Sequence, residues 1–402
     1  MAMNAPLFDI NAEEFTAEVN SYQPGAGFLW PTLFPLKFTR RFDIHGLEGD
    51  EGIPVAADRV AFNTKAPKKS RKTIGSWNGK LAKISVSRDK DEVDINNYND
   101  DKAIADSSTN NQQEKEQLVA LVYDDVAFVN NAMDARVELD SLRIACSGMQ
   151  TYKQTIDGEM TTEDVINFNI PADNYVGVSV GNKKDSAGKV LNEHVVWTEY
   201  DSADGIEDLI QAQELIARKG LPKPRFAYME KAKFQDLCAQ KATARRLFPQ
   251  VNDLSVISAE MINLTTINAY MARADHNYPQ IMVIDTYVTI QHKDGTEETI
   301  KPWNANVVTL SPTIQLGWTW YKPVPMVQNT EALQTYGSYY KVTRYSDVNP
   351  MSETTMAEAY VQPAPIHRNS LVLLNTASKT WNNGEADTEA APAKAKKASA
   401  NA

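Results

Sequence analysis

A long stretch of helical periodicity between residues 114 and 147 constrains this chain most. Six apolar residues recur there at spacings of four, four, three, four and four: Leu118, Val122, Val126, Val129, Met133 and Val137. These spacings place them on one stripe of an α-helix, and the opposite face carries four acidic residues: Asp124, Asp134, Glu138 and Asp140. Gly148 follows, and glycine takes the left-handed conformation that ends helices. At about 1.5 Å per residue, this helix spans roughly 50 Å and predicts a scaffold element. Asp125 and Arg136 interrupt the heptads that a coiled-coil dimer would need.

The segments before this helix carry weaker signals. Residues 1–35 end in a rigid aromatic and proline cluster that includes Trp30 and Phe34, which predicts an extended arm laid on another surface. The polar stretch from Asp89 to Glu116 reads as a linker. Because the chain has 402 residues, it is long enough for two or three domain-sized units.

After Gly148 the pattern alternates between strands and helices. We expect strands near residues 166–170 and 176–180, and a helix that starts at Ser202 or Asp204 and stops at Gly220. Helices over about 230–246 and 258–274 follow. Further strands are expected at 281–284, 287–290, 298–300, 307–310, 317–321 and 370–374. The segment from Asn382 onward has no periodicity and is expected to be disordered.

A basic loop stands out in an otherwise acidic chain. Alternating apolar residues at 60–62 and 84–86 predict two short strands, and cationic side chains lie between them: Lys65, Lys68, Lys69, Arg71, Lys72 and Lys80, together with Trp77. A solvated loop tip, a nuclear-import or nucleic-acid patch, and a docking loop for an acidic partner surface all fit this pattern.

Other function classes lack support in the sequence. With 52 acidic and 41 basic residues, the net charge is −11, which argues against a protein that mainly grips phosphate. No apolar run approaches the ~18 residues of a membrane span, and the N-terminus does not resemble a secretory signal. The five histidines and two cysteines, Cys146 and Cys238, show no metal-ligand spacing. We therefore expect no catalytic site, metal or cofactor, and no membrane association.

The order of these elements resembles a known family. An arm with Leu33-Phe34-Pro35 is followed by a basic hairpin, a long helix ending at Gly148, a strand pair, Trp197 before a helix ending at Gly220, and the strand at 307–310 before Gly317-Trp318. The chain then closes on the segment from Pro365 to Leu373. This succession over about residues 28–376 resembles the major capsid proteins of tailed bacteriophages, most closely the lambda-type capsid protein E family with the Hong Kong 97-type fold.

The resemblance implies an α+β fold with a fixed division of the chain. Residues 1–45 would be the N-arm, 46–100 the E-loop, 101–199 the peripheral domain with the spine helix 114–147, and 200–320 the axial domain. Residues 321–381, with the strand at 370–374, would return to the peripheral domain, and 382–402 would form a disordered tail. Contacts between subunits would involve the E-loop residues above and four N-arm residues: Trp30, Phe34, Arg40 and Arg41.

The resemblance also implies a function. Such proteins self-assemble as hexamers and pentamers into the icosahedral head of a phage, enclosing double-stranded DNA without sequence-specific binding. Partners would be further copies of the chain, a separate scaffolding protein, a portal and a decoration protein. The site of action would be the virion, assembled in the bacterial host cytoplasm. An encapsulin-like compartment shell and a cytosolic nucleic-acid-binding protein are the alternatives. Cross-linking through Lys68 or Lys69 would need a partner asparagine, for which the sequence offers no match.

Overall fold

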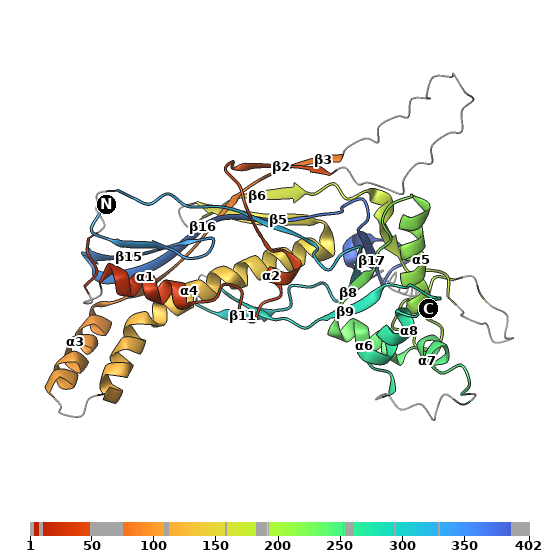
Figure 1. The fold of residues 1–402 in the computed structure, drawn as a ribbon, viewed down its shortest axis with the longest axis horizontal. Coiled ribbons are helices and arrows are strands. Elements are labelled where there is room, and N and C mark those ends of the chain that lie inside the picture. The colour runs from red at the N-terminus through yellow and green to blue at the C-terminus, as the bar shows by residue number, and fades with distance from the viewer. Residues whose placement is uncertain are drawn as a thin grey trace, which may run out of the picture.

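The computed structural model describes residues 4–7, 11–48, 75–107, 112–156, 159–181, 191, 193–251, 253, 261–292, 295–328 and 330–386. The molecule is elongated, with one sheet toward each end of its long axis and a long helix running between them (Figure 1). Helices and strands are mixed along the chain, as the α+β prediction requires.

The first sheet is built around one long central strand. β16 (Met351–Pro365) pairs along one edge with β4 (Ala82–Lys90), and along its other edge first with β15 (Lys341–Val348) and then with β13 (Gly317–Lys322). β14 (Leu333–Tyr336) extends the sheet beyond β15, and β1 (Leu36–Phe38) pairs in parallel with β13.

The long helix predicted from the apolar stripe is present as α4 (Gln112–Ser147). It ends at Gly148, whose φ is +69°, as expected. The apolar side chains of its described part, Val126, Val129, Met133 and Val137, pack in a buried cluster with Val342, Ala357 and Ala359 of the first sheet. This packing stabilises the helix by removing apolar surface from water.

Three of the four acids on the face opposite the apolar stripe of α4, Asp134, Glu138 and Asp140, are buried, whereas Asp124 is exposed. The N-terminal segment covers this face, and it contains α1 (Ala12–Ser21) and the short α2 (Trp30–Leu33). The Gly25 N–H donates to Asp134 Oδ2 at 2.6 Å, and the Trp30 N–H donates to Glu138 Oε2 at 2.7 Å. Burial raises the pKa of both carboxyl groups. The predicted arm is therefore partly helical and lies on its own subunit.

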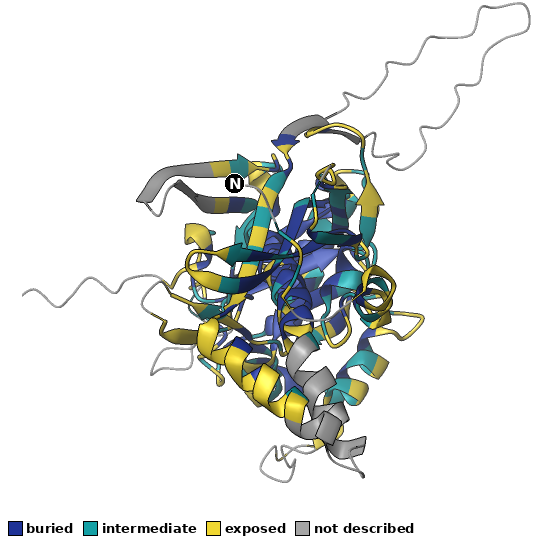
Figure 2. Cartoon of the chain, turned by 90° about the vertical axis from the view of Figure 1, so that its left-hand side faces the viewer, coloured by how far each residue is buried: buried dark blue, intermediate teal, exposed yellow. Residues whose placement is uncertain are grey.

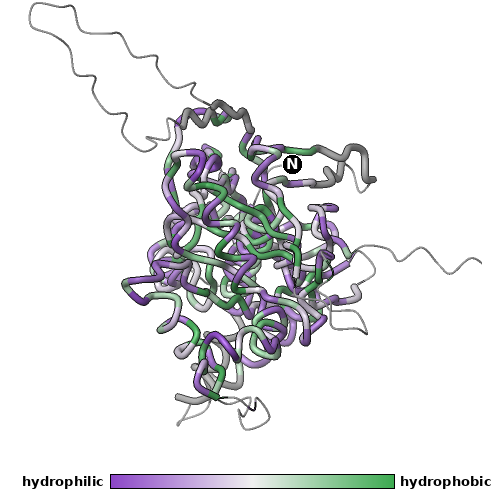
Figure 3. The backbone as a smooth tube through the Cα atoms, turned by 90° about the vertical axis from the view of Figure 1, so that its right-hand side faces the viewer, coloured by the Kyte–Doolittle hydropathy of each residue, from purple (hydrophilic) through white to green (hydrophobic). Residues whose placement is uncertain are grey.

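The second sheet has five strands in the order β7 (Tyr175–Gly177), β17 (Val372–Asn375), β12 (Val307–Ser311), β8 (Phe226–Glu230) and β9 (Gln280–Ile284). Four helices pack on it: α5 (Gly205–Arg218), α6 (Lys231–Ala239), α7 (Lys241–Leu247) and α8 (Leu264–Met271). The Asp204 side chain caps α5 by accepting from the Glu207 N–H at 3.1 Å, as the predicted N-cap requires. Hydrophobic residues are concentrated in the middle of the molecule, and hydrophilic residues lie mainly around its outside (Figure 3).

Three two-stranded hairpins complete the strands of the described chain. They are β2 (Asp43–Glu48) with β3 (Gly75–Lys80), β5 (Met149–Ile156) with β6 (Glu159–Asn167), and β10 (Val288–Gln291) with β11 (Glu297–Ile300). Two 3₁₀ turns, η1 (Ala172–Asn174) and η4 (Asn382–Gly384), lie before β7 and near the C-terminal end of the described chain.

Two further expectations, both about helical segments, differ from the structure. The linker predicted from Asp89 to Glu116 is wrong, because helix α3 (Glu92–Ser107) occupies most of it and buries Ile95 and Tyr98. The helix expected over 230–246 is broken at Gln240, whose side-chain oxygen accepts from the Gly205 N–H at 2.7 Å.

Near the C-terminus, the strand expected at 370–374 is present as β17, which pairs with β12 and with β7 in the second sheet. The disordered tail does not begin at Asn382, since the Asn375 side chain donates to the Glu385 carbonyl at 2.8 Å and Gly384 is buried. Residues 387–402 lie outside the described chain.

Candidate functional site

The hairpin of β2 and β3 is the stem of the predicted basic loop. Asp43 pairs with Lys80, and Gly46 pairs with Trp77. Lys80 is exposed, which leaves its charge available to a partner. Ile84 and Val86 lie on β4 and pair with β16, so they are not part of this stem. Five predicted contact residues lie outside the described chain: Lys65, Lys68, Lys69, Arg71 and Lys72.

The four N-arm residues separate into two groups. Trp30 and Phe34 are buried inside their own subunit. The Trp30 ring meets Tyr339 edge-on at 5.7 Å, and Phe34 packs so tightly on Gly317 that a Cβ there would lie 2.2 Å from the Phe34 ring. Arg40 and Arg41 are exposed between β1 and β2. Only the two arginines therefore offer a surface to another molecule.

Cationic and aromatic side chains alternate next to these arginines. Lys37 Nζ lies 4.4 Å from the centre of the Trp320 ring and 5.0 Å from that of Trp318. Lys322 Nζ lies 4.0 Å from the centre of the Phe42 ring. Sequence reasoning missed this group because β1 and β13 are far apart in the chain and meet only through parallel pairing.

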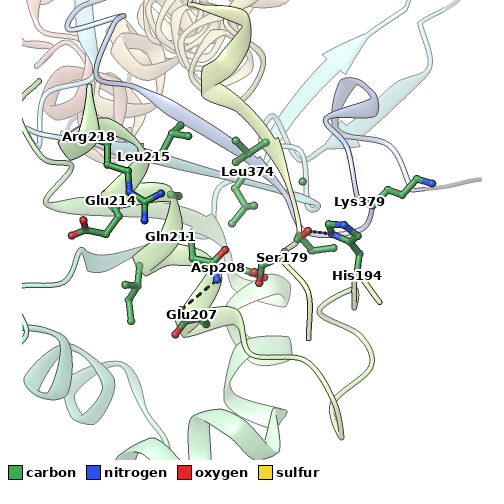
Figure 4. Close-up of a pocket in the computed structure, with 15 residues that line it drawn as sticks. Ser179, His194, Glu207, Asp208, Gln211, Glu214, Leu215, Arg218, Leu374 and Lys379 are labelled. Carbon is green, nitrogen blue, oxygen red and sulfur yellow. Dashed lines mark hydrogen bonds between the residues drawn. The ribbon is translucent and has the colours of Figure 1, made fainter. Parts of the chain in front are cut away.

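A pocket of about 580 Å³ lies between α5, β7 and β17 (Figure 4). Its buried carboxylate, Asp208, accepts hydrogen bonds from the Ser179 N–H at 2.8 Å and from Trp197 Nε1 at 2.6 Å. Burial raises the pKa of Asp208 to about 6. His194 Nδ1 lies 2.6 Å from the Val178 carbonyl oxygen. The two hydrogen bonds to Asp208 hold Ser179 and Trp197 against α5. We therefore assign Asp208 a structural role.

Metal and membrane sites have no candidates in the part of the chain that the structure describes. No three His, Cys, Asp or Glu residues gather there to hold a metal ion. Cys146 and Cys238 are free, and burial raises the pKa of both thiols to about 11. Among the described helices, none is long and apolar enough to cross a membrane.

Among the comparisons with known proteins, only the one with solved structures finds proteins similar to this chain. No protein-family model and no curated protein matches the chain. A crystal structure assigned as the capsid protein of a prophage of Escherichia coli CFT073 shares the fold with a TM-score of 0.50 and 15% identity, over 91% of this chain and 99% of that one. A phage-related protein from Bordetella bronchiseptica RB50 gives a TM-score of 0.47 and 14% identity, over 94% and 99% of the two chains.

The described architecture and this first match agree with the fold predicted from the order of elements. The chain has the Hong Kong 97-type phage capsid fold.

Proposed function

We propose that this chain is the major capsid protein of a tailed phage, which self-assembles as hexamers and pentamers into an icosahedral head around double-stranded DNA. The observation that carries the proposal is the shared fold with the prophage capsid protein over 91% of this chain and 99% of that one. The proposed role requires no catalysis.

Two surfaces fit contacts between subunits. The β2–β3 stem leads into the basic segment that contains Lys65, Lys68, Lys69, Arg71 and Lys72, and it carries the exposed Lys80 and the Trp77 position. Arg40 and Arg41 are exposed at the end of the N-terminal segment. Because the chain is acidic as a whole, its copies present the negative charge that these cations attract.

The division into N-arm, E-loop, peripheral and axial domains extends this proposal. The sheet around β16, with α4, would be the peripheral domain, and α5–α8 on the second sheet would lie around the capsomer axis. A scaffolding protein, a portal and a decoration protein would be the other partners. The chain would assemble in the host cytoplasm and act in the virion.

Sedimentation and negative-stain electron microscopy of the purified chain test this function. We expect closed shells, tubes or capsomer rings when the chain is expressed with its phage's scaffolding protein. Nuclease-protected DNA in native particles would separate a phage head from an encapsulin-like compartment. A chain that stays monomeric with the scaffolding protein would contradict the proposal.

A further inference from the structure

Cations at the end of the N-terminal segment and on β13 lie beside aromatic rings, either in space or in sequence. We define the cationic aromatic surface as Lys37, Arg40, Arg41, Phe42, Trp318, Trp320 and Lys322. Phe42 is 45% exposed and meets Tyr360 edge-on at 5.0 Å. The described chain provides no ion-pair partner within 4.0 Å for Lys37, Arg40, Arg41 or Lys322. This surface therefore fits a partner that brings carboxylates together with an apolar side chain.

Helix α3 has the complementary chemistry. Ile95 and Tyr98 face inward, whereas Glu92, Asp94, Asp100 and Asp101 are exposed. No described residue forms an ion pair with these four acids. Val93 lies between Glu92 and Asp94 in the sequence, and its side chain is 63% exposed. Figure 2 shows α3 as a largely exposed helix at the end of the molecule that faces the viewer.

The two surfaces lie at opposite ends of β16 and do not meet within one chain. α3 follows Lys90, which pairs with Glu353 near the start of β16. The cationic aromatic surface lies along β13, which pairs with Tyr360 to Pro365 at the other end of that strand. At about 3.3 Å per residue, these ends are roughly 30 Å apart. Contact between the surfaces thus requires two copies of the chain.

We infer that α3 of one subunit docks on the cationic aromatic surface of the next copy. This inference rests on the proposed capsid function and names one contact that builds the capsomer. Because the two surfaces differ, the contact is heterologous and runs head to tail, which closes into rings when the rotation between copies permits. The carboxylates would face Lys37, Arg40 and Arg41, and Val93 would pack against the exposed edge of Phe42.

Charge reversal on both sides tests the contact. One variant carries Asp100→Lys and Asp101→Lys, another carries Arg40→Glu and Arg41→Glu, and a third carries all four changes. We expect each double variant to lower the yield of shells or rings at least about tenfold, because like charges then face each other, and the combined variant to recover most of it. Circular dichroism and the Tm of the dissociated subunit verify that every variant folds.

A matched control uses exposed acids on other elements. Glu297→Lys with Glu331→Lys changes the same charge on β11 and in the loop before β14, and it should not restore assembly of the Arg40→Glu, Arg41→Glu variant. Normal assembly of either α3 or arginine variant would overturn the inference, as would a combined variant no better than its parents. An arginine variant that loses only affinity for DNA would overturn it too. Failure of the unaltered chain to assemble with its scaffolding protein would instead reject the proposed function.

Discussion

At the residue scale, the buried pair of Arg344 and Glu353 joins β15 to β16. Both side chains are almost fully buried, and Glu353 Oε2 also accepts from the Leu7 N–H at 2.7 Å. Glu353→Gln leaves the guanidinium charge uncompensated, so we expect the free energy of unfolding of the dissociated subunit to fall by about 3–5 kcal/mol. Urea denaturation of the dissociated subunit measures this loss of stability.

The half-exposed Lys83 and its partner Glu358 provide the matched control for this substitution, because the buried Glu358 keeps a second cation, Lys341 Nζ at 3.1 Å, when Lys83 is replaced. Lys83 is about half exposed, and water screens such a pair. Lys83→Met should therefore cost less than about 1 kcal/mol. Equal losses of unfolding free energy in Glu353→Gln and Lys83→Met would contradict the claim that burial makes the Arg344–Glu353 pair more important for stability.

The buried Asp208 is expected to make the free energy of unfolding of the subunit depend on pH. Its folded pKa, about 6, lies above the ordinary value, because burial outweighs the hydrogen bonds from Ser179 and Trp197. The folded state therefore binds a proton that the unfolded state releases, and stability falls as pH rises from about 4 to about 6. Asp208→Asn removes this contribution.

Denaturation of the dissociated subunit at several pH values measures the effect. The difference in unfolding free energy between the unaltered chain and Asp208→Asn should change by roughly 2–3 kcal/mol between pH 4 and pH 7, in favour of the unaltered chain at the acidic end. A difference that stays constant with pH would show that Asp208 does not titrate in this range.

At the element scale, Gly148 fixes the end of α4 and the start of β5. Its φ is +69°, and an added Cβ would lie 2.4 Å from the Tyr175 hydroxyl and 2.7 Å from Ile170 Cδ1. Gly148→Ala therefore combines backbone strain with a clash, and we expect a loss of about 2–4 kcal/mol in thermal or urea unfolding.

Gly220, at the end of α5, separates the two causes. It has the same φ of +69°, but an added Cβ would meet nothing within 4 Å. Gly220→Ala should thus cost only the strain, about 1–2 kcal/mol. A Gly148→Ala variant as stable as Gly220→Ala would contradict the packing described at the end of α4.

Elements with one apolar face and clear ends could be predicted from the sequence. The stripe ending at Gly148 predicted α4, and Asp204 with Gly220 bounded α5. β16 could not be predicted, because it is buried on both faces and carries Glu353, Glu358 and two prolines, so neither alternation nor composition marks it. The α3 segment reads as a linker because only a few inward residues, among them Ile95 and Tyr98, interrupt its polar sequence.

The candidate site was predictable only where it is local in sequence. The basic loop and Arg40 and Arg41 could be identified as charge clusters. The role of Trp30 and Phe34 could not, because their burial depends on Glu138, Tyr339 and Gly317, which come from distant segments.

At the scale of the whole molecule, the basic loop is expected to act between subunits. Replacement of Lys68, Lys69, Arg71 and Lys72 by Ala should block or loosen shell assembly and leave the subunit folded, because the contact is electrostatic. Raised salt should weaken assembly of the unaltered chain in the same way. Sedimentation measures both. Intact assembly with lost DNA affinity would instead indicate a nucleic-acid-binding loop.

A cryo-electron microscopy reconstruction of assembled particles tests the central claim most directly. We predict a closed icosahedral shell of hexamers and pentamers, with the unit of α5–α8 around each capsomer axis and the sheet of β16 at the periphery. Particles without five-fold and six-fold capsomers, or capsomers with α5–α8 turned away from their axis, would contradict the account.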